Sequence, residues 1–210
     1  EFIAAMAKTQ SAIPQMKKLA ASLRPEFAVA RNDWKSAKVM FRDAAALLDD
    51  RELADCLRAL SQVALQKHQD ASLRQMCIEI VKDSTAKSLC KSEAVRQVMI
   101  VEKRRDSVSG VVSGLGLLIE AGAPAGSLKT VFDNEYYTVI QGTNSDVTAR
   151  MVGLGDKVYA LLTDEGEKAD LRVSLLDGHF LIEDYEGAMK MLRAGIPDRD
   201  KEWHDMASIK

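Results

Sequence analysis

The chain of 210 residues is 47% hydrophobic and 29% charged, which is typical of a folded globular protein and excludes a disordered or membrane-embedded chain. Its formal net charge of −2 argues against nucleic-acid binding, since proteins that bind polyanions usually carry a basic face or stripe. Aromatic residues make up only 5% of the chain, and Ala, Leu, Lys, Glu, Arg and Met are abundant; this composition predicts an all-α fold.

Two prolines interrupt the helical pattern at the start of the chain. Proline fits the first turn of a helix but not its interior, so Pro14 predicts a break near Ser11 and a new helix from there. Pro25 predicts a further short helix between Ser22 and Arg31 for the same reason. We therefore expect three short helical segments before the first strong turn signal.

Polar turns then separate a series of amphipathic helices. Asn32 and Asp33 predict a turn and an N-cap for a helix from Trp34 to about Leu48, and Asp49-Asp50 predicts the next turn or N-cap. The apolar stripe expected to face inward in that helix is Ala37, Met40, Phe41, Ala44 and Leu47. Further helices are predicted over residues 52–67, 70–82 and 84–104.

The middle of the chain is rich in glycine, at positions 110, 114, 116, 122 and 126. Glycine costs about 1 kcal/mol relative to alanine inside a helix, so a helix from Val108 to Ala121 requires support from close packing across Gly110 and Gly114. Residues 123–126 are then expected to form a connection.

Helical periodicity returns after residue 126 and continues to the end of the chain. It runs from Leu128 to Val139, breaks at residues 142–144 and resumes over 145–162. Residues 163–167 are expected to form a polar loop. Helices are then predicted over 169–182 and 185–193, with a last helix opening at Asp198.

Two of these stretches share one pattern: a polar turn, an aromatic residue, a small residue three positions later and a large apolar residue four beyond it. The first copy is Trp34, Ala37, Phe41 and Ala44, and the second is Tyr185, Ala188, Leu192 and Gly195. A repeated pattern of this kind is the signature of stacked helical repeats. An ordinary helical bundle is the alternative, since Ala-x3-Phe-x2-Ala is also common core spacing.

The arrangement resembles the tetratricopeptide-repeat (TPR) family, in which two antiparallel helices recur about every 34 residues. Ala71 lies one such period after Ala37, although its copy lacks the aromatic residues, and the register is lost in the glycine-containing middle. Trp203 and Met206 resemble the opening of a further repeat. The resemblance implies a right-handed α-solenoid of stacked antiparallel hairpins, irregular in the middle, forming one domain over residues 1–210 that is truncated at its C-terminal end.

The resemblance also implies a function, because TPR-like proteins line a concave groove with the first helix of each repeat and bind a protein or peptide there. Matched position by position, the groove residues would be Glu26, Asp177 and Phe180. Tyr136 and Tyr137 are neighbours on different helix faces, so one is expected in the core and Tyr137 is a candidate partner contact. Acidic and apolar groove residues favour a basic or apolar segment over an acidic C-terminal tail.

No residue pattern indicates catalysis, a metal or a cofactor. His68, His179 and His204 are scattered, and the segment from Gly122 to Thr130 lacks the Gly-Lys-Ser/Thr ending of a phosphate loop. We therefore predict a protein that is not an enzyme and has no cofactor.

The cysteines and the apolar runs limit the setting of the protein. Cys56, Cys77 and Cys90 lie in apolar helical stretches and are predicted to be buried free thiols, and their odd number favours a reducing compartment such as the cytoplasm. The most apolar stretch, from Val111 to Ile119, is shorter than the roughly 20 residues that cross a bilayer, so no membrane span is expected.

Two other functions fit the same helical pattern. The chain is alternatively a regulatory or lid domain of a larger enzyme. It is also compatible with a small-molecule sensor, for which a closed apolar cavity between Val111 and Val139 would be expected.

Overall fold

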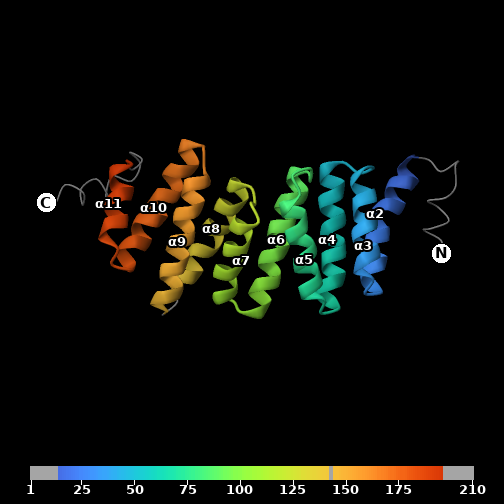
Figure 1. Cartoon of the computed structure of the whole chain (residues 1–210), viewed down its shortest axis with the longest axis horizontal. Coiled ribbons are helices and arrows are strands. Elements are labelled where there is room, and N and C mark those ends of the chain that lie inside the picture. Colours follow the sequence, from blue (N-terminus) through green and yellow to red (C-terminus); the bar gives the residue numbers. More distant parts are fainter. Residues whose placement is uncertain (1–13, 142–143, 196–210) are drawn as a thin grey trace. The chain divides into compact units, whose positions relative to one another are not determined.

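The computed structural model describes residues 14–141 and 144–195, and this part of the chain is entirely helical, which confirms the predicted all-α class (Figure 1). Over these residues there are ten helices and no strand. They are α2 (Pro14–Ala30), α3 (Trp34–Ala45), α4 (Asp50–Gln66), α5 (Asp70–Lys82), α6 (Ser88–Arg105), α7 (Ser109–Glu120), α8 (Ala125–Ile140), α9 (Ser145–Leu161), α10 (Glu165–Leu181) and α11 (Tyr185–Arg193). The helix predicted from Asp198 and the repeat opening at Trp203 lie outside the described residues.

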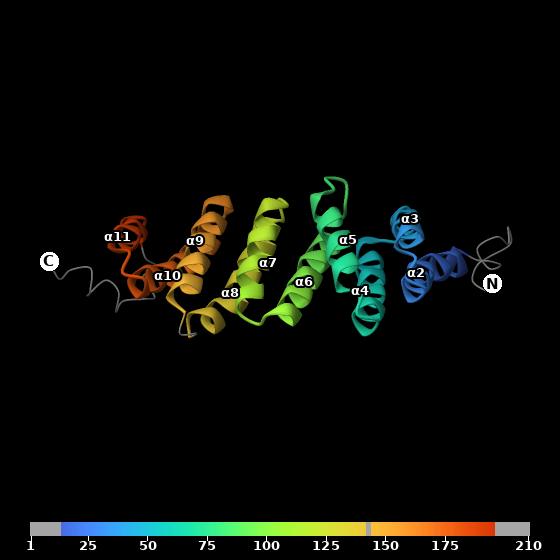
Figure 2. The same cartoon turned by 60° about the horizontal axis from the view of Figure 1, so that its bottom comes forward.

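The helices follow one another along the sequence in pairs, and Figure 1 and Figure 2 label them in chain order. We call α2, α4, α6, α8 and α10 the first helices and the helix after each of them the second helix. The first helices begin at residues 14, 50, 88, 125 and 165, so successive pairs start 36, 38, 37 and 40 residues apart. This spacing continues through the glycine-containing middle, where the sequence pattern predicted a loss of register.

The turn inside three of the pairs has the same geometry. Asn32, His68 and Glu183 each adopt a left-handed backbone with φ between 55° and 60°. In each turn the next residue donates its backbone N–H to the carbonyl five residues earlier, which closes the preceding helix. The shared turns give a spacing of 36 residues between the first two pairs, from Asn32 to His68.

This spacing corrects the position of the second repeat copy. Counted from the turns, the residue equivalent to Ala37 is Leu73, and both side chains are fully buried. Ala71, which the 34-residue period aligns with Ala37, is exposed. The two alignments differ by two residues because the turns of this chain recur after 36 residues, whereas the family resemblance implies a period of about 34.

The chain divides into two compact units. Unit 1 comprises residues 1–101 with 121–123, and unit 2 comprises residues 102–120 with 124–210. In unit 1, α2 packs against α3 and α4, and α4 also packs against α3 and α5. In unit 2, α8 and α9 each pack against α7 and α10, and α11 packs on α10. The expectation of one repeat domain over residues 1–210 stays a prediction.

Helix α2 differs from the prediction because it is continuous through Pro25. Ser22 does not cap a new helix; its hydroxyl donates to the carbonyl of Leu19 instead. Proline removes a helical hydrogen bond, but Pro25 is buried, as are Ala21 before it and Ala28 after it. Burial of this face against α3 and α4 therefore keeps the helix intact despite its proline.

Other helix boundaries differ from the predicted ones by a few residues, for local reasons. Helix α3 ends at Ala45, so Leu47 is exposed and Leu48 is buried, the reverse of the stripe predicted for a longer helix. Residues predicted as a polar loop form the first turn of α10, because Asp164 accepts a hydrogen bond from the backbone N–H of Glu167 as its N-cap.

The predicted helix in the glycine-rich segment is confirmed as α7, and Gly110 shows why a glycine is needed there. A Cβ at this position would lie 2.2 Å from the carbonyl oxygen of Glu102, so only glycine permits the close approach. Among the described helices, none is long and apolar enough to cross a bilayer.

Candidate functional site

Glu26, the groove residue predicted in the first pair, borders a hollow of about 420 Å³ between α2 and α4. Apolar side chains line it: Leu19 and Leu23 of α2, Leu48 of the connection before α4, and Ala59 of α4. Leu19 keeps 52% of its surface exposed, which makes it the most accessible apolar group there. The hollow therefore offers an apolar floor with a carboxylate at its edge.

Glu26 differs from the other carboxylates around this hollow because it has no partner in the part of the chain that the structure describes. Glu52 forms a salt bridge of 2.9 Å with Lys18, and Asp55 forms one of 2.8 Å with Arg58. The hydrogen bond from Lys18 and that from the Asp49 backbone N–H lower the pKa of Glu52. Over the described residues Glu26 makes neither a hydrogen bond nor an ion pair, so its charge is not matched.

Cys56 lies in the same hollow and is not a reactive thiol. Burial, with smaller contributions from Cys90 and Glu26, raises the pKa of Cys56 to about 12. The protonated thiol donates to the carbonyl of Ser22 at 3.1 Å. All three cysteines are buried and free, as the sequence predicted.

In unit 2, Asp177 of α10 and Tyr137 of α8 are both close to one buried ring, that of Tyr136. The Tyr136 hydroxyl donates to the carbonyl of Ser174 at 2.7 Å, and burial followed by the nearby Asp177 charge raises its pKa. The close approach needs Gly178, where a Cβ would lie 2.6 Å from that hydroxyl. Tyr137 stacks edge-on against Tyr136 with ring centroids 5.3 Å apart and is 54% exposed.

Asp177 is the second unmatched carboxylate on a first helix. It is partly buried, and this burial raises its pKa. Within the described residues it has no hydrogen-bond or ion-pair partner, so no cation of that part of the chain offsets the cost of burying its charge. The structure thus brings two predicted site residues, Tyr137 and Asp177, around the same tyrosine.

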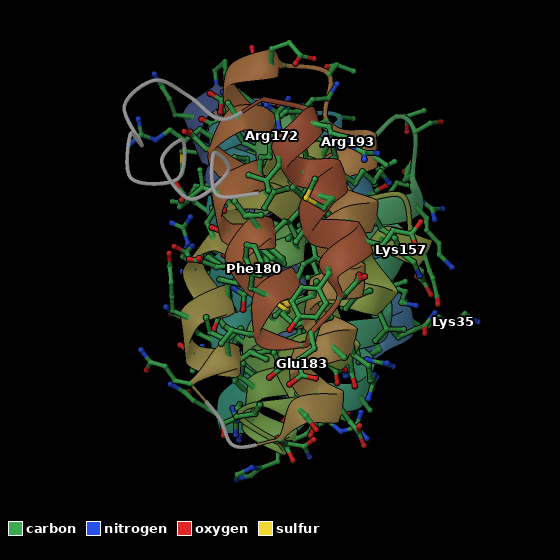
Figure 3. All side chains as sticks on the ribbon, turned by 90° about the vertical axis from the view of Figure 1, so that its left-hand side faces the viewer. Lys35, Lys157, Arg172, Phe180, Glu183 and Arg193 are labelled. Carbon is green, nitrogen blue, oxygen red and sulfur yellow. The ribbon has the colours of Figure 1, made fainter. Side chains whose placement is uncertain are left out.

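Phe180 is exposed on the last turn of α10, but its partner is Tyr185 of α11 (Figure 3). The two rings meet edge-to-face with centroids 6.4 Å apart. Phe180 therefore belongs to the hairpin end of unit 2, together with the turn residue Glu183, and Glu26 belongs to unit 1.

No sequence pattern predicted the cluster of His179, Asp156 and Asp184 in unit 2, which we call the histidine clamp. His179 is buried on α10, and its ring nitrogens lie 2.8 Å from a carboxylate oxygen of Asp184 and 3.2 Å from one of Asp156. Asp184 also caps α11 by accepting from the backbone N–H of Gly187. The cluster joins α9, α10 and α11. In the described part of the chain, no group of three or more His, Cys, Asp or Glu side chains could hold a metal ion.

Arg172 is a second buried group that no sequence pattern marked. It lies on α10, where Figure 3 shows it near the end of the helix pair away from Phe180. Its guanidinium donates to the carbonyl of Gly195 and, at 3.0 Å, to the hydroxyl of Tyr159, whose ring it also covers. A cation at this carbonyl complements the negative end of the α11 dipole, so we interpret Arg172 as a structural tie.

Unit 1 contains a comparable tie at Glu93 of α6. Its carboxylate accepts from Arg58 of α4 at 3.0 Å, from Arg96 at 2.8 Å and from Gln97 at 2.6 Å. Burial opposes ionisation of Glu93, but these hydrogen bonds outweigh it and lower its pKa. Glu93 is thus fully matched, in contrast to Glu26 and Asp177.

No family model, curated protein or solved structure matches the chain. A proposal for its function therefore depends on the residues described above.

Proposed function

We propose that the chain is a non-catalytic protein-interaction scaffold whose first helices bind a basic, partly apolar segment of a partner protein. Two carboxylates carry this proposal, because each lies beside an apolar or aromatic surface and has no partner among the described residues: Glu26 on α2 at the apolar hollow, and Asp177 on α10 next to the Tyr136–Tyr137 pair. Neighbouring carboxylates such as Glu52 and Glu93 are paired within the chain. Unpaired acidic groups on a surface favour a cationic partner through charge complementarity.

Asp177 and Tyr137 have the chemistry to bind one cationic side chain. A lysine or arginine placed at Asp177 would offset the cost of its buried charge, and the exposed face of Tyr137 would add a cation–π interaction. In unit 1 the hollow beside Glu26 would receive an apolar side chain on Leu19 and Leu23. Taken separately in its own unit, each site combines an acidic group with an apolar or aromatic surface, so each suits a segment that alternates basic and apolar residues.

The proposal includes a TPR-like solenoid as the scaffold. It is supported by the recurrence of helix pairs every 36 to 40 residues and by the packing of helices on near neighbours inside each unit. The right-handed superhelix implied by the family resemblance is part of the proposal.

The sensor alternative has less support. Residues expected to line a closed cavity, among them Val111, Leu115 and Phe132, are fully buried by their neighbours. The hollow near them, between α7 and α9 at Gly116 and Gly153, is open to solvent. A lid domain of a larger enzyme differs from our proposal in what it binds, which is its own polypeptide.

The proposal is tested with a fluorescent peptide that alternates lysine and leucine and a matched peptide of glutamate and leucine. We expect the lysine peptide to bind, and Glu26→Lys and Asp177→Lys each to weaken it about tenfold in fluorescence anisotropy. The matched controls are Asp43→Lys and Glu186→Lys, which reverse exposed carboxylates on second helices. Equal binding of both peptides, or equal effects of site and control variants, would overturn the proposal.

A further inference from the structure

A separate cavity of about 360 Å³ lies in unit 1 between the second helices α3 and α5 and the start of α6. It is distinct from the hollow beside Glu26, which lies between α2 and α4 and shares no lining residue with it. Its volume falls within the range of about 300 to 1,000 Å³ that is typical of small-molecule sites.

The floor of this cavity is apolar. Phe41 of α3, Leu53 of α4 and Met76 of α5 line it and are buried, and Ile80 adds a half-buried aliphatic surface. Cys90 also lines it; burial raises the pKa of this thiol to about 12, so it adds no charge. Such a floor suits a hydrocarbon chain.

When the ion pairs and hydrogen bonds within the protein are counted, more positive than negative charge is left on the side chains that line the cavity. Glu79 is bound by Lys38, with 2.7 Å between nitrogen and oxygen, and Asp83 accepts from the backbone N–H and hydroxyl of Thr85. Arg42 lies in the electrostatic field of both acids but makes no hydrogen bond or ion pair over the described residues. Lys87 donates to the neutral carbonyl of Leu48 and lies in the electrostatic field of Asp50, but it forms no ion pair over the described residues.

The N-terminus of α6 is not available to an anion. Asp50 already accepts from the backbone N–H groups of Leu89 and Cys90, at 2.9 and 3.0 Å. The cations left for a ligand are therefore those of Arg42 and Lys87, and the excess charge at the cavity is positive.

We propose that this cavity binds a small amphipathic anion, with its aliphatic chain on Phe41, Met76 and Ile80 and its carboxylate at Arg42 and Lys87. Carboxylates are the preferred partners of a guanidinium, which donates two parallel hydrogen bonds. The proposal does not depend on the peptide-binding surface, because no residue lines both sites, although α4 contributes to each.

The test is isothermal titration calorimetry of the full 210-residue chain with octanoate, octylamine and octanol. We expect one octanoate to bind per chain, more tightly than either uncharged octanol or cationic octylamine. Arg42→Glu should weaken octanoate binding at least about tenfold, whereas Lys82→Glu, an exposed cation of α5 outside the cavity, should leave it unchanged.

A second variant tests the location directly. Ala45 lines the cavity and is partly exposed, so Ala45→Phe should fill the space and weaken octanoate and octanol alike, with folding checked by far-ultraviolet circular dichroism. Absence of saturable octanoate binding would overturn the proposal. So would tighter binding of octylamine, or equal losses in Arg42→Glu and Lys82→Glu.

Discussion

Asp177 is kept in a position where its charge is costly to the free protein. Burial raises its pKa, so the carboxylate ionises more readily in the unfolded chain than in the folded one. Ionisation therefore destabilises the fold: the penalty is absent below the ordinary pKa of 3.8 and grows as the pH rises through the folded-state pKa.

Replacing this charge should separate stability from binding. We expect Asp177→Asn to raise the melting temperature by roughly 2 °C at pH 7, and the gain to shrink as the pH falls toward 3.8. The same variant should weaken binding of the lysine–leucine peptide. A variant that is less stable than the parent at pH 7 would mean that Asp177 has an intramolecular partner.

Asp184 is the opposite case, a carboxylate that the fold stabilises. Its hydrogen bond from the Gly187 backbone N–H, and secondarily its contact with His179, lower its pKa. The stabilisation is complete above the ordinary pKa of 3.8 and is lost as the pH falls through the lower folded-state pKa. Asp184→Ala should cost about 1 kcal/mol of unfolding free energy in urea denaturation at pH 7.

The control for this prediction is Asp184→Asn, because asparagine also caps helices but carries no charge. It should retain most of the stability that Asp184→Ala loses. Equal losses in the two variants would show that the charge facing His179 matters more than the cap.

At the level of the helix, two helical glycines, one exposed and one buried, should respond oppositely to alanine. Gly153 is exposed inside α9, and a Cβ added there would meet no other atom within 4 Å, so Gly153→Ala should stabilise the protein by about 1 kcal/mol. Gly110→Ala should destabilise it, because the new Cβ would lie 2.2 Å from the Glu102 carbonyl. Thermal denaturation of both variants decides this, and effects of the same sign would contradict the packing described for Gly110.

Helix starts were more predictable from the sequence than helix continuity. Asp33 and Asp49 both accept hydrogen bonds from the backbone at the starts of α3 and α4, as their residue types predicted. The separate helix predicted around Pro25 is wrong, because the loss of a helical hydrogen bond at this proline is outweighed by burial of its face against α3 and α4. Asp164 was assigned to a loop although it is a good capping residue.

The candidate site was predictable only in part. Glu26 and Asp177 were selected by their positions in a family pattern, and the sequence could not show that they lack partners. The clamp at His179 joins residues 156, 179 and 184, and the tie at Arg172 uses a backbone carbonyl at residue 195. Neither has a sequence signature, because both depend on how α9, α10 and α11 pack.

For the molecule as a whole, the net charge is close to zero, so the positions of individual charged side chains decide which partner it binds. With a formal net charge of only −2, long-range attraction for a basic partner is weak. Binding must then come from the few unmatched carboxylates and from the apolar groups beside them. The scaffold account therefore predicts a localised binding face on the first helices.

The most direct test of this account is amide chemical-shift mapping of the chain during titration with the lysine–leucine peptide. We predict that the shifted signals belong to the first helices, around Glu26 on α2 and around Tyr137 and Asp177 on α8 and α10. Signals of α3, α5, α9 and α11 should stay in place away from those contacts. Shifts concentrated on the second helices, or none at saturating peptide, would contradict the central claim.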